Sequence, residues 1–387
     1  MTNTKKTILF IHRWLGFISG LAVFIVSITG CIYCFQDDIQ DILYDYRTVE
    51  PVSKAFVIPS KLIDLAHVRY PEGKITSVIY YGPARSVQVR ITVKKKAMSL
   101  FYNPYSANFL HEQVLKDNFF AFIKEAHLYL FLPKEIGKMV NGVSVITFVI
   151  IMISGIVLWW PKRKSDRKRS FTIKWNSKWK RVNYDLHNVL GFYATAIAIL
   201  LAITGLSYSF QWVSKGIYNI ANVVSNVPNE KRSFKSDSVN AVLYPDSALS
   251  INKAYQQVIH NSPKANYLLM VLASKPGSVI SVTAYPKPLH FSYSDNYAFD
   301  KYSGKMLNFL PFQEKSNGLK INNMNYDIHT GQIMGIPGKI IAFLASLISA
   351  TLPVTGLIIY LGKKGKKKRK QVASPGKPMD MKSKDVS

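Results

Sequence analysis

The sequence predicts a mainly α-helical membrane protein with four spanning helices, arranged as a duplicated two-helix unit, and two small α+β modules outside the bilayer. Four windows of about 20 apolar residues recur along the 387-residue chain, and each is long enough to cross a hydrocarbon layer. Two long polar segments between them carry turn residues and alternating apolar positions, which are typical of strands. Motifs of the first half return in the same order in the second half.

The same pattern sets the expected boundaries. We expect spans at residues 1–36, 136–161, 187–212 and 336–362, outer modules at 37–135 and 213–335, a basic loop at 162–186 and a basic tail at 363–387. Each outer module reads as one helix followed by strands, near 75–81, 86–93 and 97–102 in the first and near 266–272, 278–285 and 294–300 in the second. Two such modules are expected to face each other outside the membrane.

The positive charge indicates which side of the membrane each segment occupies. The net charge is +28, and the loop Pro161–Arg181 carries ten Lys and Arg while Lys363–Lys370 carries seven. Both lie on the same side of the four spans as the N-terminus, and an excess of Lys and Arg marks the cytoplasmic side. We therefore expect both termini in the cytoplasm, basic contacts to the lipid bilayer, and no nucleic-acid partner.

The first and third spans share one pattern that begins with a histidine. His12 precedes Gly30 by 18 residues and His187 precedes Gly205 by 18, which is about five helical turns. Small residues follow each histidine on one helix face: Gly16, Ser19, Gly20, Val23, Ser27 and Gly30 in the first span, and Gly191, Ala194, Thr195, Ala198, Ala202 and Gly205 in the third. Such a stripe lets a flat, bulky group lie against the backbone. Close packing of two helices explains small residues equally well.

A second pair of histidines precedes the second and fourth spans. His127 stands 28 residues before Gly155, and His329 stands 27 before Gly356. The segment FYNPYSANFL (101–110) likewise resembles AFDKYSGKML (298–307). Parallel repeats imply a pseudo-two-fold axis along the membrane normal. That axis places His12 opposite His187 on the cytoplasmic side, and His127 opposite His329 on the outer side.

Five motifs together resemble a known family. They are HRWLG (12–16), SGIVLWWP (154–161), LHNVLG (186–191), IHTG (328–331) and PVTG (353–356). With a helix-plus-strands module in each half, nearly the whole chain is similar to the PepSY-associated transmembrane family. That resemblance implies PepSY-like periplasmic modules, a bacterial inner-membrane location, b-type haem and ferric-siderophore reduction. One departure is YSAN, ending at Asn108, where the second half has the more family-like YSGK.

Facing imidazoles across a slot of small residues suit a haem iron with two axial nitrogens. Filling both axial positions leaves no site for oxygen and favours electron transfer. We expect about two haems, bound without thioether bonds because the sequence has no C-x-x-C-H motif. The cofactor-binding residues we expect are His12, His187, His127 and His329 as ligands, with Arg13, Gly16 and Gly191 beside them. Zinc and a proton relay remain alternatives, and Arg13 serves equally well as a cytoplasmic anchor.

The resulting functional hypothesis is a haem-dependent reductase that passes electrons across the membrane to a periplasmic ferric siderophore or other Fe(III) chelate and releases Fe(II). No dinucleotide fingerprint follows a strand in this sequence, so the electron donor is expected to be a quinol or a separate protein. The rival hypothesis is a membrane-anchored PepSY-type protein that regulates or contacts a peptidase without redox activity. A permease is disfavoured because no span carries an intramembrane acid.

The two cysteines and the remaining histidines do not predict a specific function. Cys31 and Cys34 share a helix face and are either a redox pair or, more simply, buried apolar thiols. The segment ITGC (28–31) also resembles a lipoprotein cleavage site, although cleavage there would remove His12. His67, His111, His260 and His290 lie in the outer modules without matched partners. We expect them to be surface or local structural residues.

Overall fold

The structure is a computed structural model that describes residues 2–161, 163–224, 230, 234–237, 247–275 and 277–372, and of these only the backbone at 247 and 363–372. Residues 373–387 of the predicted tail lie outside this described part. So do short pieces of the predicted second outer module, at 225–229, 231–233, 238–246 and 276.

Four helices in the described residues are long and apolar enough to cross a membrane, which confirms the prediction of four spans. The first, second and fourth are α1 (Asn3–Cys34), α5 (Lys134–Trp159) and α12 (Ile336–Val372). The third is one continuous helix that consists of α7 (Trp179–Asp185), a π-helical turn (Leu186–Leu190) and α8 (Gly191–Ser209). Helices α1 and α8 each pack against both α5 and α12. The four therefore form a ring in which α1 and α8 occupy opposite corners.

The third and fourth helices are longer than the sequence suggested. The third begins at Trp179 rather than His187, and an ion pair between Arg181 and Asp185, 2.8 Å long, supports its first turns because residues four apart are neighbours on a helix. His187 lies in the π-helical turn. The fourth helix continues past residue 362 to Val372, into the segment expected as a basic tail.

Strands from both outer segments join in one antiparallel sheet rather than in two modules that face each other. The strands are β1 (Lys74–Tyr80), β2 (Val87–Val93), β3 (Lys96–Tyr102), β4 (Phe109–Val114), β5 (Tyr267–Val271), β6 (Ile280–Tyr285), β7 (Asp295–Phe299) and β8 (Met306–Leu310), in the order β4-β3-β2-β1-β5-β6-β7-β8. The halves meet where β1 pairs with β5, with Val78 opposite Met270. Strands β4 and β8 were not expected, because these edge strands are half exposed and carry mixed polar and apolar residues.

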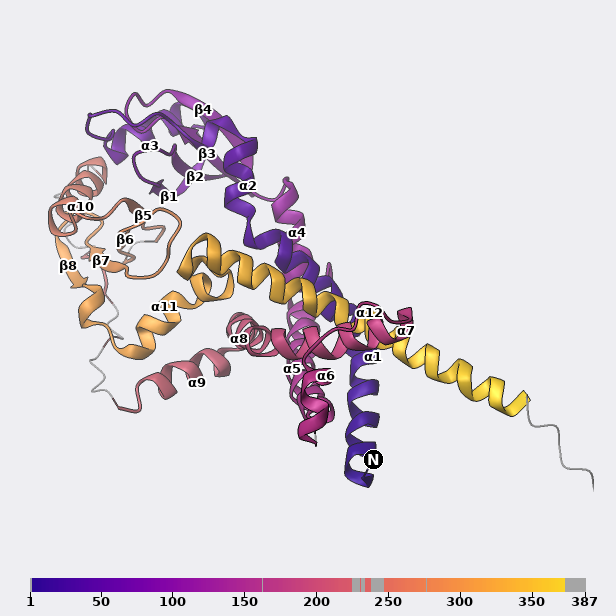
Figure 1. The fold of residues 1–387 in the computed structure, drawn as a ribbon. Helices are drawn as coiled ribbons and strands as arrows, with labels where there is room; N and C mark the ends of the chain where they lie inside the picture. Colours follow the sequence, from indigo (N-terminus) through magenta and orange to yellow (C-terminus); the bar gives the residue numbers. More distant parts are fainter. Residues whose placement is uncertain are drawn as a thin grey trace, which may run out of the picture.

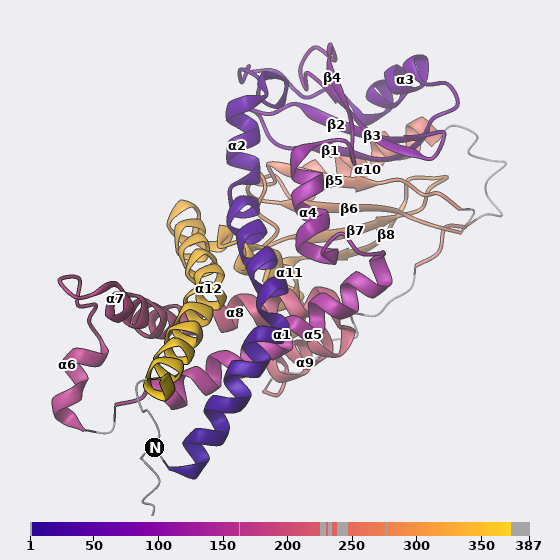
Figure 2. The ribbon, with the colours of Figure 1, turned by 90° about the vertical axis from the view of Figure 1, so that its right-hand side faces the viewer.

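One hydrophobic core spans both halves of the sheet. Helices α3 (Pro59–Arg69) and α10 (Ser247–Asn261) cover one face of it, as Figure 2 shows. Leu62 of α3 and Val258 of α10 are fully buried against strand residues such as Val78 and Met270. Burying one such side chain stabilises the fold by about 1.5–3 kcal/mol. Since the core is continuous across β1 and β5, the two outer segments fold as one layer.

The sheet lies at one end of the helical ring, and the N-terminus, α6 (Arg167–Ser170) and the far end of α12 lie at the other (Figures 1 and 2).

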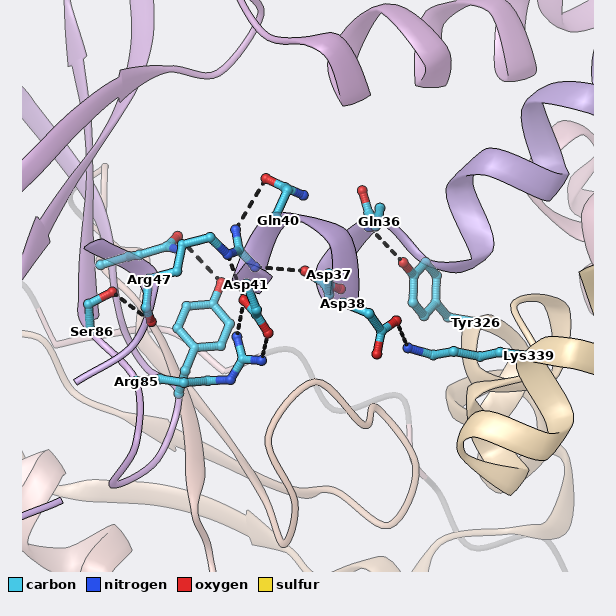
Figure 3. A network of polar contacts seen from close by, with 12 residues as sticks. Gln36, Asp37, Asp38, Gln40, Asp41, Arg47, Arg85, Ser86, Tyr326 and Lys339 are labelled. Atoms are coloured by element: carbon cyan, nitrogen blue, oxygen red, sulfur yellow. Dashed lines mark hydrogen bonds and ion pairs between the residues drawn. The ribbon is translucent and has the colours of Figure 1, made fainter. Parts of the chain in front are cut away.

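Helix α2 (Gln36–Leu43) connects the two parts through the polar network in Figure 3. Its Asp37 and Asp41 accept hydrogen bonds from Arg47, at 2.9 and 2.8 Å. Further contacts join Arg85 to Asp41, Lys339 to Asp38 and Gln36 to Tyr326.

Short helices return the chain from the sheet to the ring: α4 (Phe119–Tyr129) before α5, and α11 (Asn317–His329) before α12. Helix α9 (Gln211–Ala221) extends the chain beyond α8 and packs on α11. A Cβ at Gly137 would lie 2.3 Å from the carbonyl oxygen of Tyr129, and one at Gly338 would lie 2.1 Å from that of Gly331. Glycine at these two positions therefore lets α4 and α11 fold tightly onto the start of the next helix, which places His127 and His329 at the ring.

Candidate functional site

Within the described part of the chain, two cavities lie among the helices of the ring, one toward each end. The loop-side cavity, about 600 Å³, is lined by His12 and His187, and the sheet-side cavity, about 480 Å³, is lined by His127 and His329. Both volumes lie in the range of small-molecule and cofactor pockets. The 18 residues from His12 to Gly30, which contacts His127, span about 27 Å of helix. Val23 and Phe148 line both cavities, so the two spaces adjoin there.

In the loop-side cavity, a hydroxyl on the neighbouring helix holds each histidine. The Nδ1 atom of His12 lies 2.9 Å from Ser154 Oγ, and that of His187 lies 2.9 Å from Thr355 Oγ1. Each hydroxyl already donates its proton to a carbonyl of its own helix, Ser154 to Ile151 and Thr355 to Thr351. The hydroxyl oxygens therefore accept from the imidazoles, so Nδ1 carries the hydrogen and Nε2 keeps its lone pair.

The sheet-side histidines are held in a corresponding way. The Nδ1 atom of His127 donates to the carbonyl oxygen of Val26, at 3.0 Å, and lies 3.1 Å from Thr29 Oγ1. For His329 the partners are the carbonyl oxygen of Leu201 and Thr204 Oγ1, both at 3.0 Å. A carbonyl oxygen can only accept, so these rings also carry hydrogen on Nδ1. A histidine that donates through one nitrogen and offers the other is typical of a metal ligand.

A glycine lies behind each of the four rings. A Cβ at Gly155 would stand 3.4 Å from Cε1 of His12, and one at Gly356 would stand 3.3 Å from Cε1 of His187. The corresponding distances are 3.4 Å from Gly30 to His127 and 3.1 Å from Gly205 to His329. Each ring is thus held by a hydroxyl and lies close to the glycine that follows this hydroxyl residue on the same helix.

The four supporting sites are Ser/Thr-Gly dipeptides, whose role in holding the histidines is not evident from the sequence. They are Thr29-Gly30, Ser154-Gly155, Thr204-Gly205 and Thr355-Gly356. The dipeptides were visible as repeat markers near the ends of the spans. Their contact with histidines on other helices could not be read from spacing, because each contact joins segments about 100 or more residues apart.

The sheet-side pair has the separation that a shared metal requires. The ring centroids of His127 and His329 are 6.1 Å apart, with an angle of 59° between the ring planes. Two imidazoles on one metal, with metal–nitrogen bonds of about 2 Å, have centroids roughly 5 to 6 Å apart, the larger value when the two nitrogens lie on opposite sides of the metal. In the described residues, no group of three or more His, Cys, Asp or Glu side chains is placed to hold a metal ion. Two nitrogens with no further protein ligand suit a haem iron better than zinc.

Burial keeps the sheet-side imidazoles neutral. Burial lowers the pKa of His329 to about 4, and the neighbouring His127 lowers it further, while the hydrogen bond to Leu201 opposes the shift. The pKa of His127 is also lowered, again by burial, against the opposing hydrogen bond to Val26. At neutral pH both rings therefore offer a lone pair on Nε2, which is the form that binds metals.

The predicted small-residue stripes line the two cavities. Gly16, Gly20, Gly191 and Thr195 line the loop-side cavity, and Ser27, Gly30, Ala198, Ala202 and Gly205 line the sheet-side cavity. A Cβ at Gly16 would meet no atom within 4 Å, whereas one at Gly191 would lie 3.3 Å from Leu352. Gly16 therefore borders open space, and Gly191 also serves the packing of α8 against α12.

Arg13 also lines the loop-side cavity. Its guanidinium carbon lies 5.4 Å from the ring centroid of Tyr360, and its buried Nε atom has no hydrogen-bond partner among the described residues. A buried donor without a partner is costly. Arg13 is thus placed where its guanidinium can pair with an anionic group of a molecule bound in the loop-side cavity.

His111 and His290 line neither cavity. His111 stacks on Tyr46 with ring centroids 4.0 Å apart, and His290 Nε2 contacts Gln332 at 2.9 Å. Cys31 and Cys34 are buried free thiols, and Cys34 lines the sheet-side cavity.

A ring of apolar helices, two histidine-lined cavities and a sheet at one end define a multi-pass membrane protein with two candidate cofactor sites. The profile of the PepSY-associated TM region matches residues 9–363, so the chain belongs to that family. The match confirms the resemblance seen in the five motifs. Among curated proteins, none matches the chain.

Proposed function

We propose that the protein is a haem b-dependent ferric-chelate reductase that carries electrons across the bacterial inner membrane to a periplasmic ferric siderophore or other Fe(III) chelate. The observation that carries the proposal is the arrangement of four half-buried imidazoles, two in each cavity. In the described part of the chain, each has Nδ1 hydrogen-bonded and Nε2 left without a protein partner. In this proposal, His12 with His187 and His127 with His329 are the residues that would hold the iron of two haems. When bound, haem supplies an iron that accepts and passes on single electrons.

The residues around each pair prepare it for that cofactor. The Ser/Thr-Gly dipeptides orient the rings, and the small-residue stripes leave room for a flat macrocycle beside the backbone. Arg13 offers a cation for a haem carboxylate in the loop-side cavity. Desolvation keeps the sheet-side imidazoles neutral, which is the form in which they would bind a metal.

The two cavities divide a long electron path into shorter steps. A hydrocarbon layer is about 30 Å thick, and the two sites are spaced along α1 by about 27 Å of helix. We propose a quinol or a protein as donor at the loop side. Each electron delivered at the sheet side reduces one Fe(III) to Fe(II), which the chelator holds far less tightly.

We further infer that the chain is a duplicated two-helix unit, and that its two PepSY-like outer segments, which share one sheet, are periplasmic. Corresponding contacts in the two halves support this. His12 of α1 is hydrogen-bonded to α5, and His187, just before α8, is hydrogen-bonded to α12. Likewise, His127 is hydrogen-bonded to α1, and His329 is hydrogen-bonded to α8. The positive-inside rule then places the termini and the loop around residues 162–178 in the cytoplasm, with the sheet in the periplasm.

The proposal is tested by mixing dithionite-reduced, haem-loaded protein with a ferric chelate in the presence of a colorimetric Fe(II) trap. We expect reoxidation of the haem spectrum at the rate at which trapped Fe(II) forms. A protein that binds haem but leaves the chelate ferric would not be a reductase. A protein that binds no haem under replete conditions would favour the regulatory, PepSY-type anchor instead.

A further inference from the structure

Three lysines from α4 and α5 line the sheet-side cavity: Lys124, Lys134 and Lys138. Lys124 and Lys134 are exposed and Lys138 is half-buried, so they mark the mouth through which the cavity meets water. None of the three forms an ion pair with another described residue, and no Asp or Glu is among the residues that line this cavity. We call these three residues the lysine mouth.

Two carboxylates stand next to the lysine mouth in sequence but lie outside the cavity lining. Glu125 follows Lys124, and Glu135 follows Lys134. Adjacent residues on a helix point about 100° apart. The lysines therefore present uncompensated positive charge toward the cavity while the glutamates point elsewhere on the helix surface.

The lysine mouth belongs to one half of the chain. Lys138 follows Gly137 as Lys339 follows Gly338, but Lys339 is buried in an ion pair with Asp38 (Figure 3) and does not line the cavity. The residue three positions before His127 is Lys124, whereas the residue three positions before His329 is Tyr326. In the described part of the second half, the matching positions are thus neutralised or uncharged. The positive charge is a local feature and not a by-product of the repeat.

This asymmetry indicates where and how an acceptor approaches. Several like charges at the rim of a low-dielectric cleft attract an opposite charge and raise its association rate by about 10- to 1,000-fold. The lysine mouth lines the same cavity as His127 and His329, and its residues come from α4 and the first residues of α5, which connect the sheet to the ring. Two exposed ammonium groups remain within reach of a molecule in solution.

We propose that Lys124, Lys134 and Lys138 form the docking site for an anionic Fe(III) chelate whose iron is held by oxygen donors such as carboxylates. This inference rests on the proposed reductase function and adds to it the charge of the substrate and its point of entry. In the step, one electron passes from the reduced sheet-side site to the docked Fe(III), giving Fe(II). No bond to the protein forms, and the chelate leaves with its charge more negative by one.

The test compares two triple variants of the full-length, haem-loaded protein. One is Lys124→Glu, Lys134→Glu and Lys138→Glu. The matched control is Lys61→Glu, Lys253→Glu and Lys264→Glu, three exposed lysines on or beside α3 and α10, which changes the total charge equally. The readouts are kcat/KM for Fe(III) citrate and for a neutral Fe(III) tris-hydroxamate, binding of redox-inert Ga(III) citrate, and the haem content and spectrum.

We expect the lysine-mouth variant to lose about 10- to 100-fold in kcat/KM for Fe(III) citrate at low ionic strength, and less as salt screens the charges. Ga(III) citrate binding should weaken in parallel, while the neutral chelate and the control variant change by no more than about twofold. Unchanged citrate kinetics, or equal losses for both chelates, would overturn the docking site. Loss of haem or a shifted haem spectrum in the lysine-mouth variant would also overturn the docking site, because it would show that the lysines hold haem carboxylates instead. A wild-type protein that reduces neither chelate would instead refute the reductase function itself.

Discussion

Each cavity histidine is fixed by a hydroxyl and a glycine that follow one another on a neighbouring helix. The tightest case is His329, whose Cε1 atom would lie 3.1 Å from a Cβ on Gly205. The hydroxyl of Thr204 and the carbonyl oxygen of Leu201 hold Nδ1 of the same ring. Because the hydrogen bonds and the contact act on one small ring, a single added methyl group must shift the imidazole or the helix.

We therefore expect Gly205→Ala to weaken haem binding at the sheet-side cavity by about 10- to 100-fold, the usual cost of disturbing the groups that orient a metal ligand. Haem content and the absorption spectrum of the purified variant measure this. Gly216→Ala in α9 is the control, because a Cβ there would meet no atom within 4 Å. Equal haem content in Gly205→Ala and wild type would show that the glycine does not position His329.

The sequence predicted the four histidines and their two pairs as candidates, because symmetry in the spacing is visible without a structure. It did not predict the supporting contacts, since Ser154 and Thr355 act on rings from distant segments. The π-helical turn at His187 was also unforeseen. No residue type specifies such a turn, which depends on how the helix packs.

At the scale of the elements, two turns in the sheet differ at one backbone position. The turn after β3 contains Ala107 at φ 63°, and the turn after β7 contains Gly304 at φ 70°. Alanine pays about 1–2 kcal/mol for this left-handed conformation, whereas glycine does not. The first half has YSAN where the second half has the family-like YSGK, so the backbone at Ala107 is strained in this outer turn.

Ala107→Gly should therefore raise the thermal unfolding midpoint of the full-length protein, with a gain in unfolding free energy of about 0.5–1 kcal/mol after the extra freedom of unfolded glycine is subtracted. Circular dichroism in detergent measures it. Gly304→Ala should do the reverse and more strongly, because the new Cβ would lie 2.8 Å from the carbonyl oxygen of Ser250. A destabilised Ala107→Gly variant would contradict this account of the turn.

Asp300 gives the second turn a dependence on pH that the first turn lacks. Burial opposes its ionisation, but hydrogen bonds from Ser303, Asp237 and Tyr302 outweigh this and lower the pKa of the carboxyl. A lowered pKa means that the carboxylate stabilises the fold above the unfolded value of about 3.9 and that this stabilisation is lost as the pH falls through the lowered value. Asn103, which caps the matching turn, has no charge to lose.

We expect Asp300→Asn to lower the unfolding free energy by about 1–2 kcal/mol at pH 7, since charge-assisted hydrogen bonds are replaced by neutral ones. The difference from wild type should shrink as the pH falls below about 3.9. Thermal unfolding at pH 7 and at acidic pH measures both values. A difference that stays constant with pH would show that the charge of Asp300 contributes nothing.

The number of spanning helices and the strand-rich outer segments followed from hydropathy and alternation alone. The joining of β1 to β5 did not, because either edge of each strand group could have paired. The edge strands β4 and β8 were missed for a related reason, since half-exposed strands lack strict alternation. Pairing between distant segments is decided by packing, which a single sequence does not display.

For the whole molecule, charge and architecture predict one orientation. The basic loop lies at the end of the ring opposite the sheet (Figure 2), and basic loops remain cytoplasmic. Reporter fusions at Lys168 and near Ser278 should therefore give opposite signals, cytoplasmic for the first and periplasmic for the second. Matching signals at the two positions would refute the four-span topology.

The central claim, that each cavity binds one haem between two histidines from different halves of the chain, is tested most directly by a pyridine-haem count with reduced-minus-oxidised spectra. We expect about two b-type haems in the wild type. His12→Ala and His187→Ala should disturb one of them, and His127→Ala and His329→Ala the other, because losing an axial nitrogen changes only the iron to which it was bound. No haem in a replete preparation, or a shared spectral defect in His12→Ala and His127→Ala, would contradict the account.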